Sequence, residues 1–251
     1  MRQSNFLRID LMKNKRLTFS FDDGVTQDIR FMKLLDKYGM KGTFNLNSQF
    51  LGHEGAWHVD GVPINHTKSK PEDIKYLYEG HEVAAHTLTH PFLLDLSKEE
   101  IIRQVEDDRV KLSELCGYEV VGLAYPNGGK NFNDFVSQTV KENTGIKYAR
   151  TIISSYSFDV PKDLYQFHPT AWNYGELDKI FELGKQFLEL KAEEPKIFCI
   201  WGHTYEFDAK DTWGRMEEFL EMMSGREDIS YLTNKDALLK GLSLLSRPKK
   251  S

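Results

Sequence analysis

The segment TFSFDDGV, Thr18 to Val25, decides the fold that this 251-residue chain predicts. Its apolar and β-prone residues predict a strand over Leu17–Phe21. That strand runs directly into two adjacent carboxylates, Asp22 and Asp23, and a glycine follows them. A buried strand that ends in paired acids opens onto a metal, a substrate or solvent, and the rest of the sequence has to distinguish these.

Short apolar runs alternate with longer amphipathic runs along nearly the whole chain. The short runs predict strands at Leu17–Phe21, Thr43–Asn47, Glu82–Ala85, Val120–Tyr125, Lys147–Thr151, Leu164–Phe167, Ile197–Trp201 and Ile229–Leu232. The amphipathic runs predict helices at Gln27–Tyr38, Pro71–Glu79, Lys98–Cys116, Phe132–Asn143, Glu176–Leu190 and Thr212–Ser224, with a last short helix after Asn234. About seven or eight strand–helix units predict a parallel sheet that closes, or nearly closes, into a distorted (β/α)7-8 barrel. A doubly wound open sheet is the alternative.

The chain predicts one domain over residues 1–251, with a core from about residue 15 to residue 242, because no repeat or composition shift divides it. One segment, Gly52–Ser69, is polar and too irregular to predict a helix or strand. A loop of this length in a compact domain is usually functional or mobile. One hypothesis is that its histidines, His53, His58 and His66, reach the site as a lid.

Composition excludes several classes of function. A formal net charge of -5 implies no basic face, which argues against nucleic acid as a partner. The sequence has no run of 18 apolar residues and therefore predicts no membrane span. Residues 1–16 lack the apolar region of a secretory signal, so we expect a cytoplasmic protein. Cys116 and Cys199 lie in apolar surroundings, which favours buried free thiols over a disulfide.

Polar side chains follow most of the predicted strands. In a parallel barrel, the carboxyl ends of the strands form the active-site rim. The residues expected there are Asp22 and Asp23, Asn45 and Asn47, His86–His90 (HTLTH), Tyr125–Gly129 (YPNGG), His168 and Trp201–Asp208 (WGHTYEFD).

Two histidines four residues apart, His86 and His90, can face one metal ion. The pair alone is a weak signal, and two solvated loop histidines are the alternative. Two imidazoles with one carboxylate, however, form a common open metal site, and Asp22–Asp23 supplies that carboxylate. The second acid would take a proton from a water molecule whose pKa the ion lowers. A pair of helix-capping aspartates is the competing interpretation.

His203 ends the apolar run KIFCIWGH. A lone histidine there is more often a core residue. Its place on the rim favours the general acid that a hydrolase needs for its leaving group.

These residues, in this order, resemble the polysaccharide deacetylase family (carbohydrate esterase family four). SFDDG matches the family's T-F-D-D-G motif with Ser20 in place of threonine, and HTLTH matches H-[ST]-x-x-H in full. The resemblance extends from about Leu17 to the C-terminal YLTNKDALLKG. It implies a distorted barrel and one divalent metal ion, zinc first, with Co2+, Ni2+ or Mn2+ as alternatives.

Carried over by position, the resemblance makes Asp23, His86 and His90 the metal ligands. It makes Asp22 the general base that activates water on the metal, and His203 the general acid that protonates the departing amine.

The third family motif, R-x-P-Y-G, aligns less well with AYPNG, residues 124–128. Ala124 stands where the family has the arginine that holds the catalytic aspartate, so we expect Asp22 to lack that positive charge. Asn127 stands where the family has a tyrosine whose backbone N–H faces the oxyanion, and any residue can supply that group. These departures predict altered chemistry or substrate rather than an inactive enzyme.

The family's Asp–Trp motif has no clean counterpart, although Trp172 can form the hydrophobic wall. Trp201 replaces a leucine that usually lies two residues before the histidine. Tyr205 and Glu206 follow His203 closely and are further candidates for substrate contact, with a solvent-facing Glu206 as the alternative. The remaining candidate saccharide contacts are Asn45, Asn47, Tyr125 and Trp201.

Together these features predict a metal-dependent carbohydrate deacetylase, a hydrolase that removes an N-acyl group, acetyl first, from an amino sugar or saccharide. Two alternatives stay open. One is another amide hydrolase on the same barrel, such as a ureide or formamide hydrolase, some of which bind no metal. The other is an inactive saccharide-binding relative.

Overall fold

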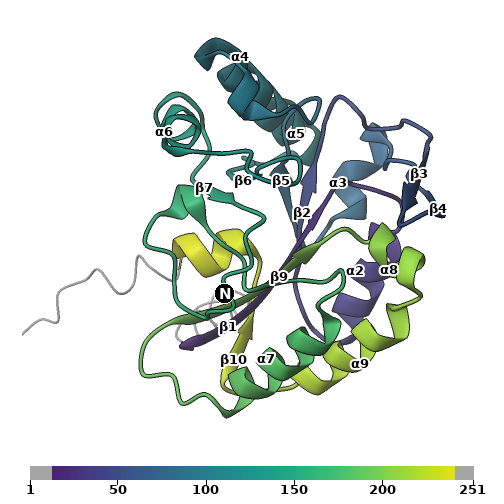
Figure 1. Ribbon diagram of the computed structural model, residues 1–251, viewed down its shortest axis with the longest axis vertical. Helices are drawn as coiled ribbons and strands as arrows, with labels where there is room; N and C mark the ends of the chain where they lie inside the picture. Colours follow the sequence, from purple (N-terminus) through teal and green to yellow (C-terminus); the bar gives the residue numbers. More distant parts are fainter. Residues whose placement is uncertain (1–12, 241–251) are drawn as a thin grey trace, which may run out of the picture.

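The computed structural model describes residues 13–240, and its centre is the first strand (Figure 1). All eight residues of β1 (Lys15–Asp22) are buried. On one side β1 pairs along seven residues with β9 (Lys196–Gly202). On the other side its first half pairs with β10 (Ile229–Tyr231) and its second half with β2 (Thr43–Leu46). Parallel strands that are buried on both faces are apolar nearly throughout. This explains the apolar, β-prone sequence of Thr18–Phe21.

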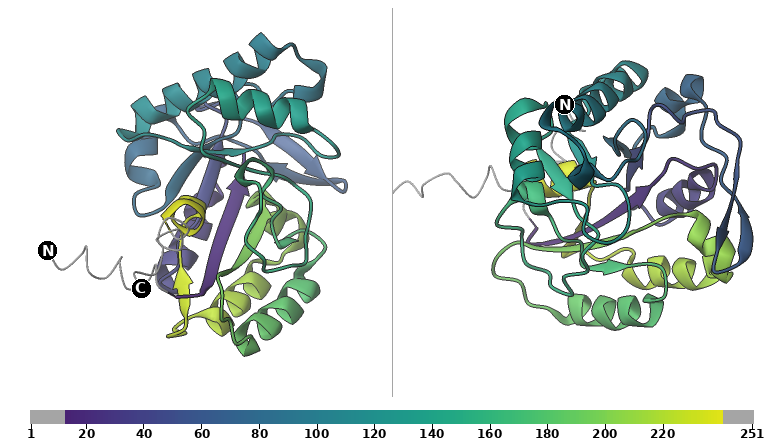
Figure 2. Two further views of the ribbon diagram at one scale, coloured as in Figure 1. Left: turned by 90° about the vertical axis from the view of Figure 1, so that its left-hand side faces the viewer. Right: turned by 45° about the horizontal axis from the view of Figure 1, so that its top comes forward.

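The other strands extend this sheet in parallel, in the order β7-β6-β5-β2-β1-β9-β8. Their bounds are β5 (Glu82–Ala85), β6 (Gly122–Ala124), β7 (Tyr148–Arg150) and β8 (Ala171–Trp172). The sheet curls into a half-barrel (Figure 2). Its two end strands, β7 and β8, do not pair with each other among residues 13–240, and an isolated bridge joins Arg150, at the end of β7, to Phe167. The prediction of a distorted barrel is confirmed.

Helices cover the outside of the curled sheet in two groups (Figures 1 and 2). One group consists of α2 (Asp28–Lys37), α7 (Leu177–Glu189), α8 (Tyr205–Lys210) and α9 (Trp213–Met223). The other consists of α4 (Lys98–Ile102), a π-helical turn (Arg103–Asp107), α5 (Asp108–Cys116) and α6 (Asp134–Asn143), with α3 (Ile74–Leu77) nearby in sequence. The Ser97 side chain accepts a hydrogen bond from the Glu100 N–H and caps α4, as its spacing predicts.

Aromatic rings join the sheet to its helices. The rings of Phe21 on β1 and Phe31 on α2 lie 4.4 Å apart between centroids, and Phe207 on α8 lies 5.5 Å from Phe31. All three are at most 1% exposed. This packing fixes the carboxyl end of β1, where Asp22 and Asp23 follow.

Both cysteines are buried and free, as expected. Between residues 13 and 240, no helix has the length and apolar character needed to cross a membrane.

Two local predictions are wrong. Leu164–Phe167 is not a strand but contains a 3-10 turn, Leu164–Gln166, because the Asp163 side chain accepts the Tyr165 N–H and turns the backbone. The segment Gly52–Ser69, expected to be irregular, contains an antiparallel hairpin of β3 (Ala56–Val59) and β4 (Val62–Asn65). Its turn residues, Asp60 and Gly61, both have positive φ, 49° and 80°. Asp-Gly is the preferred sequence for such a two-residue turn.

Candidate active site

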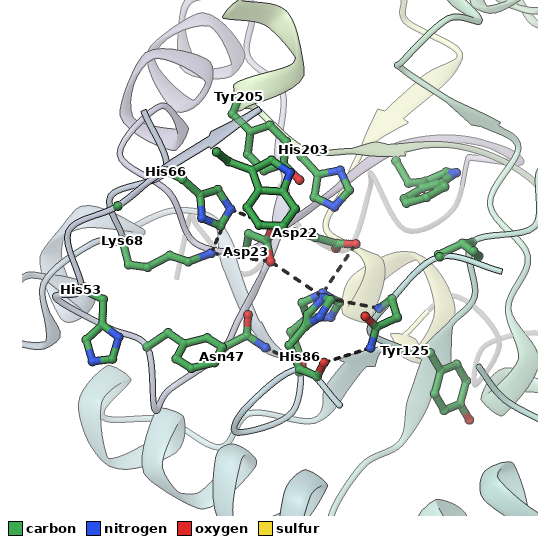
Figure 3. Close-up of a pocket in the computed structure, with 18 of the residues that line it drawn as sticks. Asp22, Asp23, Asn47, His53, His66, Lys68, His86, Tyr125, His203 and Tyr205 are labelled. Atoms are coloured by element: carbon green, nitrogen blue, oxygen red, sulfur yellow. Dashed lines mark hydrogen bonds and ion pairs between the residues drawn. The ribbon is translucent and has the colours of Figure 1, made fainter. Parts of the chain in front are cut away.

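A cavity of about 720 Å3 opens at the carboxyl ends of the strands (Figure 3). Residues 53–55, 57, 66 and 68, in and beside the β3–β4 hairpin, line one side of it, and residues at or after the carboxyl ends of β1, β2 and β5 to β9 line the rest. Among the residues predicted from the sequence, those that line the cavity are Asp22, Asp23, Asn47, His53, His66, His86, His90, Tyr125, Asn127, Gly128, Gly129, Trp172, Trp201, His203 and Tyr205. Asn45 and His168 do not line it.

Asp23, His86 and His90 form a compact group of metal-ligand type. One ligand atom from each lies within 4.8 Å of the others. The His86 Nδ1 atom is 2.8 Å from the Ala124 carbonyl oxygen, which requires the proton on Nδ1 and leaves the lone pair on Nε2. That Nε2 atom is buried and has no hydrogen-bond partner among residues 13–240. A histidine held in this way by a carbonyl is the usual arrangement around a metal.

The charge state of the group also suits a metal. Burial lowers the pKa of His86, and burial together with His86 lowers the pKa of His90 to about 4. Burial alone would raise the pKa of Asp23, but a hydrogen bond from His66 and the charge of Lys68 hold it well below its usual value. Two neutral imidazoles and one carboxylate are the forms that bind a divalent ion, so these residues fit one.

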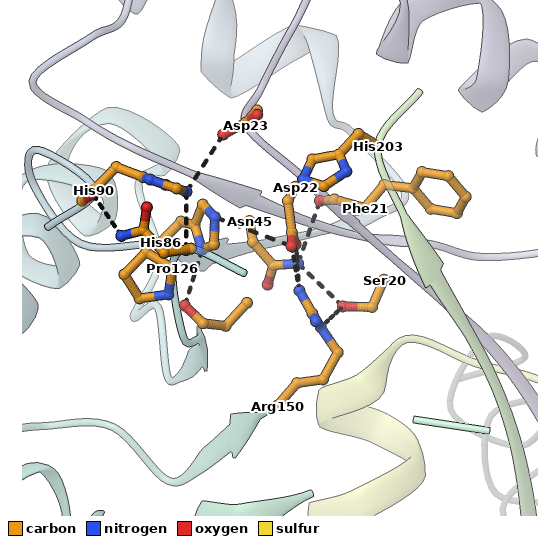
Figure 4. A network of polar contacts seen from close by, with 12 residues as sticks. Ser20, Phe21, Asp22, Asp23, Asn45, His86, His90, Pro126, Arg150 and His203 are labelled. Atoms are coloured by element: carbon orange, nitrogen blue, oxygen red, sulfur yellow. Dashed lines mark hydrogen bonds and ion pairs between the residues drawn. The ribbon is translucent and has the colours of Figure 1, made fainter. Parts of the chain in front are cut away.

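Asp22 is fully buried and lies beside this group (Figure 4). The Arg150 guanidinium donates to both of its carboxylate oxygens, at 2.5 Å to Oδ2, and to Ser20 Oγ at 3.0 Å. The Asn45 amide donates to Asp22 Oδ1 at 2.8 Å. Burial alone would raise the pKa of Asp22, but the charge of Arg150 leads the interactions that lower it. Asp22 is therefore an ionised carboxylate with a fixed orientation.

The expectation that Asp22 lacks a positive partner is wrong. Ala124 on β6 and Arg150 on β7 are register partners in the sheet. Neighbouring strands of a sheet lie about 4.8 Å apart. The Arg150 guanidinium therefore reaches Asp22 from β7, one strand away from the β6 position at which the family motif has its arginine. In the sequence, the only indication of this partner was Arg150 itself, at the end of the predicted strand that contains YAR. Its contact with Asp22 becomes visible only once the strand register is known.

Glu206 holds His203. Its carboxylate accepts the His203 backbone N–H at 2.9 Å and lies 3.0 Å from His203 Nδ1. Trp172 Nε1 also donates to it, at 3.3 Å. Burial alone would lower the pKa of His203, but the Glu206 charge and hydrogen bond raise it to about 9. Glu206 is 5% exposed, so the interpretation that it faces solvent is wrong.

The backbone of Asn127 faces the metal-ligand group. Its N–H donates to His90 Nε2 at 3.3 Å, and its side-chain amide donates to the His90 carbonyl at 2.9 Å. Asn127, Asp23, Thr87 and His90 all have positive φ, between 55° and 83°. Such backbone strain in residues other than glycine collects at functional sites, where the surrounding structure enforces it.

Aromatic rings form the wall on the β9 side. Trp172 and Trp201 are register partners on β8 and β9 and stack at 5.4 Å. The Arg150 guanidinium lies 4.9 Å from the Trp201 ring, so this indole also packs over the ion pair. Tyr125 contributes its ring to the cavity, while its hydroxyl donates to the Tyr165 carbonyl.

The hairpin segment brings two further groups to Asp23. His66 Nε2 is 3.3 Å from Asp23 Oδ2, and Lys68 Nζ is 3.6 Å from Asp23 Oδ1. His53 lines the cavity, but His58 does not. At the hairpin turn, Asp60 pairs with Lys210 at 2.9 Å. Lys68 was missed from the sequence because nothing in its neighbourhood marks it as a site residue.

Comparisons with known proteins show the family of this chain. Residues 11–149 match the sequence profile of the family described as Polysaccharide deacetylase. A curated relative, the peptidoglycan-N-acetylmuramic acid deacetylase PdaC of Bacillus subtilis (strain 168), is 36% identical over 119 residues. That match covers 47% of this chain and 22% of PdaC, so the chain matches about a fifth of the relative's length.

Solved structures share the fold. A family 4 acetyl xylan esterase from Clostridium thermocellum, in complex with a cobalt ion, superposes with a TM-score of 0.57 and 15% identity over 93% of both chains. The Xyl-CE4 domain of a multidomain xylanase from the hindgut metagenome of Trinervitermes trinervoides superposes with a TM-score of 0.55 and 16% identity. That match covers 90% of this chain and 91% of the xylanase domain.

Proposed function

Because this chain belongs to the polysaccharide deacetylase family, we propose that it is a metal-dependent hydrolase that removes an N-acyl group, acetyl first, from an amino sugar or saccharide. One observation carries the proposal. A group of metal-ligand type, a buried ionised aspartate and a carboxylate-bound histidine meet in one cavity.

Asp23, His86 and His90 would hold the ion, with zinc as the first candidate because of this donor set. When bound, a divalent ion supplies Lewis acidity to the acyl carbonyl and lowers the pKa of water.

Asp22 acts as the general base. Its ionised carboxylate, oriented by Arg150, takes a proton from the water molecule that attacks the acyl carbon. A C–O bond forms, and negative charge develops on the former carbonyl oxygen. The Asn127 N–H, which points into the metal-ligand group, is placed to stabilise that charge.

His203 acts as the general acid. Its Nδ1 is engaged by Glu206, so Nε2 carries the proton that goes to the departing amine as the C–N bond breaks. The raised pKa of about 9 keeps the imidazole protonated at neutral pH. Arg150 and Glu206 contact neither substrate nor ion in this scheme and are positioning residues. Trp172 is placed to contact a sugar ring.

Elemental analysis combined with acetate release tests the proposal. We expect about one divalent ion per chain in the wild type, lost in Asp23→Ala, His86→Ala and His90→Ala. Asp22→Asn should keep the ion and lose acetate release from N-acetyl chitooligosaccharides. No ion in the wild type after reconstitution with zinc would refute this proposal and favour a metal-independent amide hydrolase.

A further inference from the structure

Lys68 is a buried cation in the cavity wall, with a side chain 7% exposed. Its Nζ atom has two polar contacts among residues 13–240: His66 Nε2 at 3.5 Å and Asp23 Oδ1 at 3.6 Å. Both are longer than the roughly 2.7–2.9 Å of a charge-assisted hydrogen bond. An ammonium group has three donors, so Lys68 keeps donor capacity for a group that enters the cavity.

The position of this ammonium is built into the fold. The backbone of Lys68 pairs with Val25, two residues after Asp23, and its N–H donates to the His53 carbonyl at 2.9 Å. The next residue, Ser69, donates its N–H to the Gly24 carbonyl at 2.9 Å. The chain that returns from the hairpin is therefore tied to the loop after β1, and it delivers Lys68 beside Asp23.

Charge balance shows what kind of group Lys68 would attract. The Arg150 charge is matched by Asp22, and the His203 charge is matched by Glu206. The nearest counter-charge of Lys68 is Asp23, the carboxylate that a divalent ion would share. The charge of Asp28 also acts on Lys68, but burial raises the pKa of Asp28 to about 7, so this carboxyl is a weaker counter-charge. Among the described residues that line the cavity, the other carboxylate is Glu54, which is exposed. With an ion on Asp23, Lys68 would lack a full counter-charge, and a buried cation without one is costly.

We propose that Lys68 binds a carboxylate on the substrate, so that the enzyme prefers an N-acyl amino sugar with an acidic substituent close to the amide. This inference rests on the proposed function. A single ammonium beside one imidazole suits a carboxylate better than a phosphate, which proteins commonly hold with several donors or an arginine fork. The cavity, about 720 Å3, lies within the range of about 300–1,000 Å3 typical of small-molecule sites.

The test compares N-acetylmuramic acid, which carries a carboxylate on its lactyl ether, with its neutral carboxamide. We expect wild-type kcat/KM to favour the acid about 10- to 100-fold, the range of a hydrogen bond between charged groups. Lys68→Met should remove this preference, and Lys68→Arg should keep part of it. Lys210→Met removes an exposed lysine at the end of α8, which pairs with Asp60 at the hairpin turn, and should leave the preference unchanged.

Two further measurements separate the possible failures. Elemental analysis of Lys68→Met should still find about one ion per chain, which excludes metal loss as the cause. Calorimetric binding of both compounds to Asp22→Asn, with and without Lys68→Met, tests the contact without turnover. No hydrolysis of either compound by metal-loaded wild type would count against the proposed function alone. Equal use of both compounds, or an equal loss of both in Lys68→Met, would overturn the role of Lys68.

Discussion

Arg150 and Ala124 show how a site can keep its charges while its sequence motif changes. The ion pair between Arg150 and Asp22 is buried, with exposed side-chain fractions of 0% and 2%. A motif search compares residue 124, an alanine, with the family's arginine. The pKa of the Asp22 carboxyl, however, depends on where the positive charge lies and not on which strand carries it. The functional unit is the guanidinium beside Asp22, not the residue number that carries it.

Arg150→Gln should therefore leave Asp22 as a buried carboxylate without a counter-charge. We expect the free energy of unfolding to fall by about 3–5 kcal/mol. Arg150 lowers the pKa of Asp22, so its stabilising effect is present above the unfolded-state pKa and is lost as pH falls. The acid limb of the kcat/KM profile should accordingly move to higher pH in the variant.

Urea denaturation and the pH–rate profile measure these two effects. Arg150→Lys is the matched control, because it keeps the charge and should retain part of the stability. An unchanged acid limb in Arg150→Gln would contradict the assignment of Arg150 as the group that keeps Asp22 ionised.

Glu206 offers a second test at the residue scale. Its charge raises the pKa of His203 to about 9, so the acid form persists up to about that pH. In Glu206→Gln the alkaline limb of kcat/KM should move down towards the ordinary histidine value of about 6.5. Any stability that this pair contributes is present below about pH 6.5 and is lost as pH rises through about 9. A limb that stays near pH 9 would show that Glu206 does not set this pKa.

Asn127→Gly tests whether the backbone of residue 127 is the functional group. Glycine keeps the N–H and relieves the positive φ of 67°. We expect kcat/KM to remain within about tenfold of wild type, because the donor in question belongs to the main chain. Asn127→Pro removes the N–H and, because proline fixes φ near −65°, also displaces the loop, so it should lose at least 100-fold in acetate release, in the range of a lost oxyanion donor or more. Similar values for the two variants would argue against this role.

At the scale of elements, the β3–β4 hairpin depends on its turn. Gly61 has φ of 80°, so Gly61→Ala should destabilise the hairpin by about 1 kcal/mol. Gly214→Ala is the matched control, for which we expect the free energy of unfolding to rise instead of fall. Gly214 lies within α9 with no atom within 4 Å of an added Cβ, so alanine should stabilise by about 0.5–1 kcal/mol. Hydrogen exchange over residues 56–65 should speed up in the first variant only.

The buried parallel strands were predictable because their apolar runs and the helices between them form a strong pattern. The hairpin was not predicted, because its strands are largely exposed and carry no clear alternation. The Asp60–Gly61 dipeptide between two valines was nevertheless a recognisable turn signal. Asp23, His86 and His90 were found together because the motifs are local. The roles of Arg150 and Lys68 were missed because their contacts depend on register and on the path of the hairpin, and Glu206 was named without its contact to His203.

For the molecule as a whole, we expect the fold to persist without metal. His66 and Lys68 already accompany Asp23, so no uncompensated carboxylate remains when an ion leaves. Chelator-treated protein should keep its far-UV circular dichroism. Zinc at about 100 times its dissociation constant should add about 2.7 kcal/mol and raise Tm by several degrees. Asp23→Ala should show no such rise, and unfolding on chelation would contradict the expectation.

The pairing of β1 also constrains how the chain can fold. Lys15 on β1 pairs with both Lys196 on β9 and Ile229 on β10. The amino-terminal half of β1 therefore acquires its two neighbouring strands only from the far end of the sequence. Contacts so distant along the chain slow folding. During synthesis, one edge of β1 stays unpaired until β9 and β10 emerge from the ribosome. Unpaired apolar strand edges favour aggregation. Expression yield should therefore be more sensitive to chaperone supply and growth temperature than the stability of the finished protein suggests.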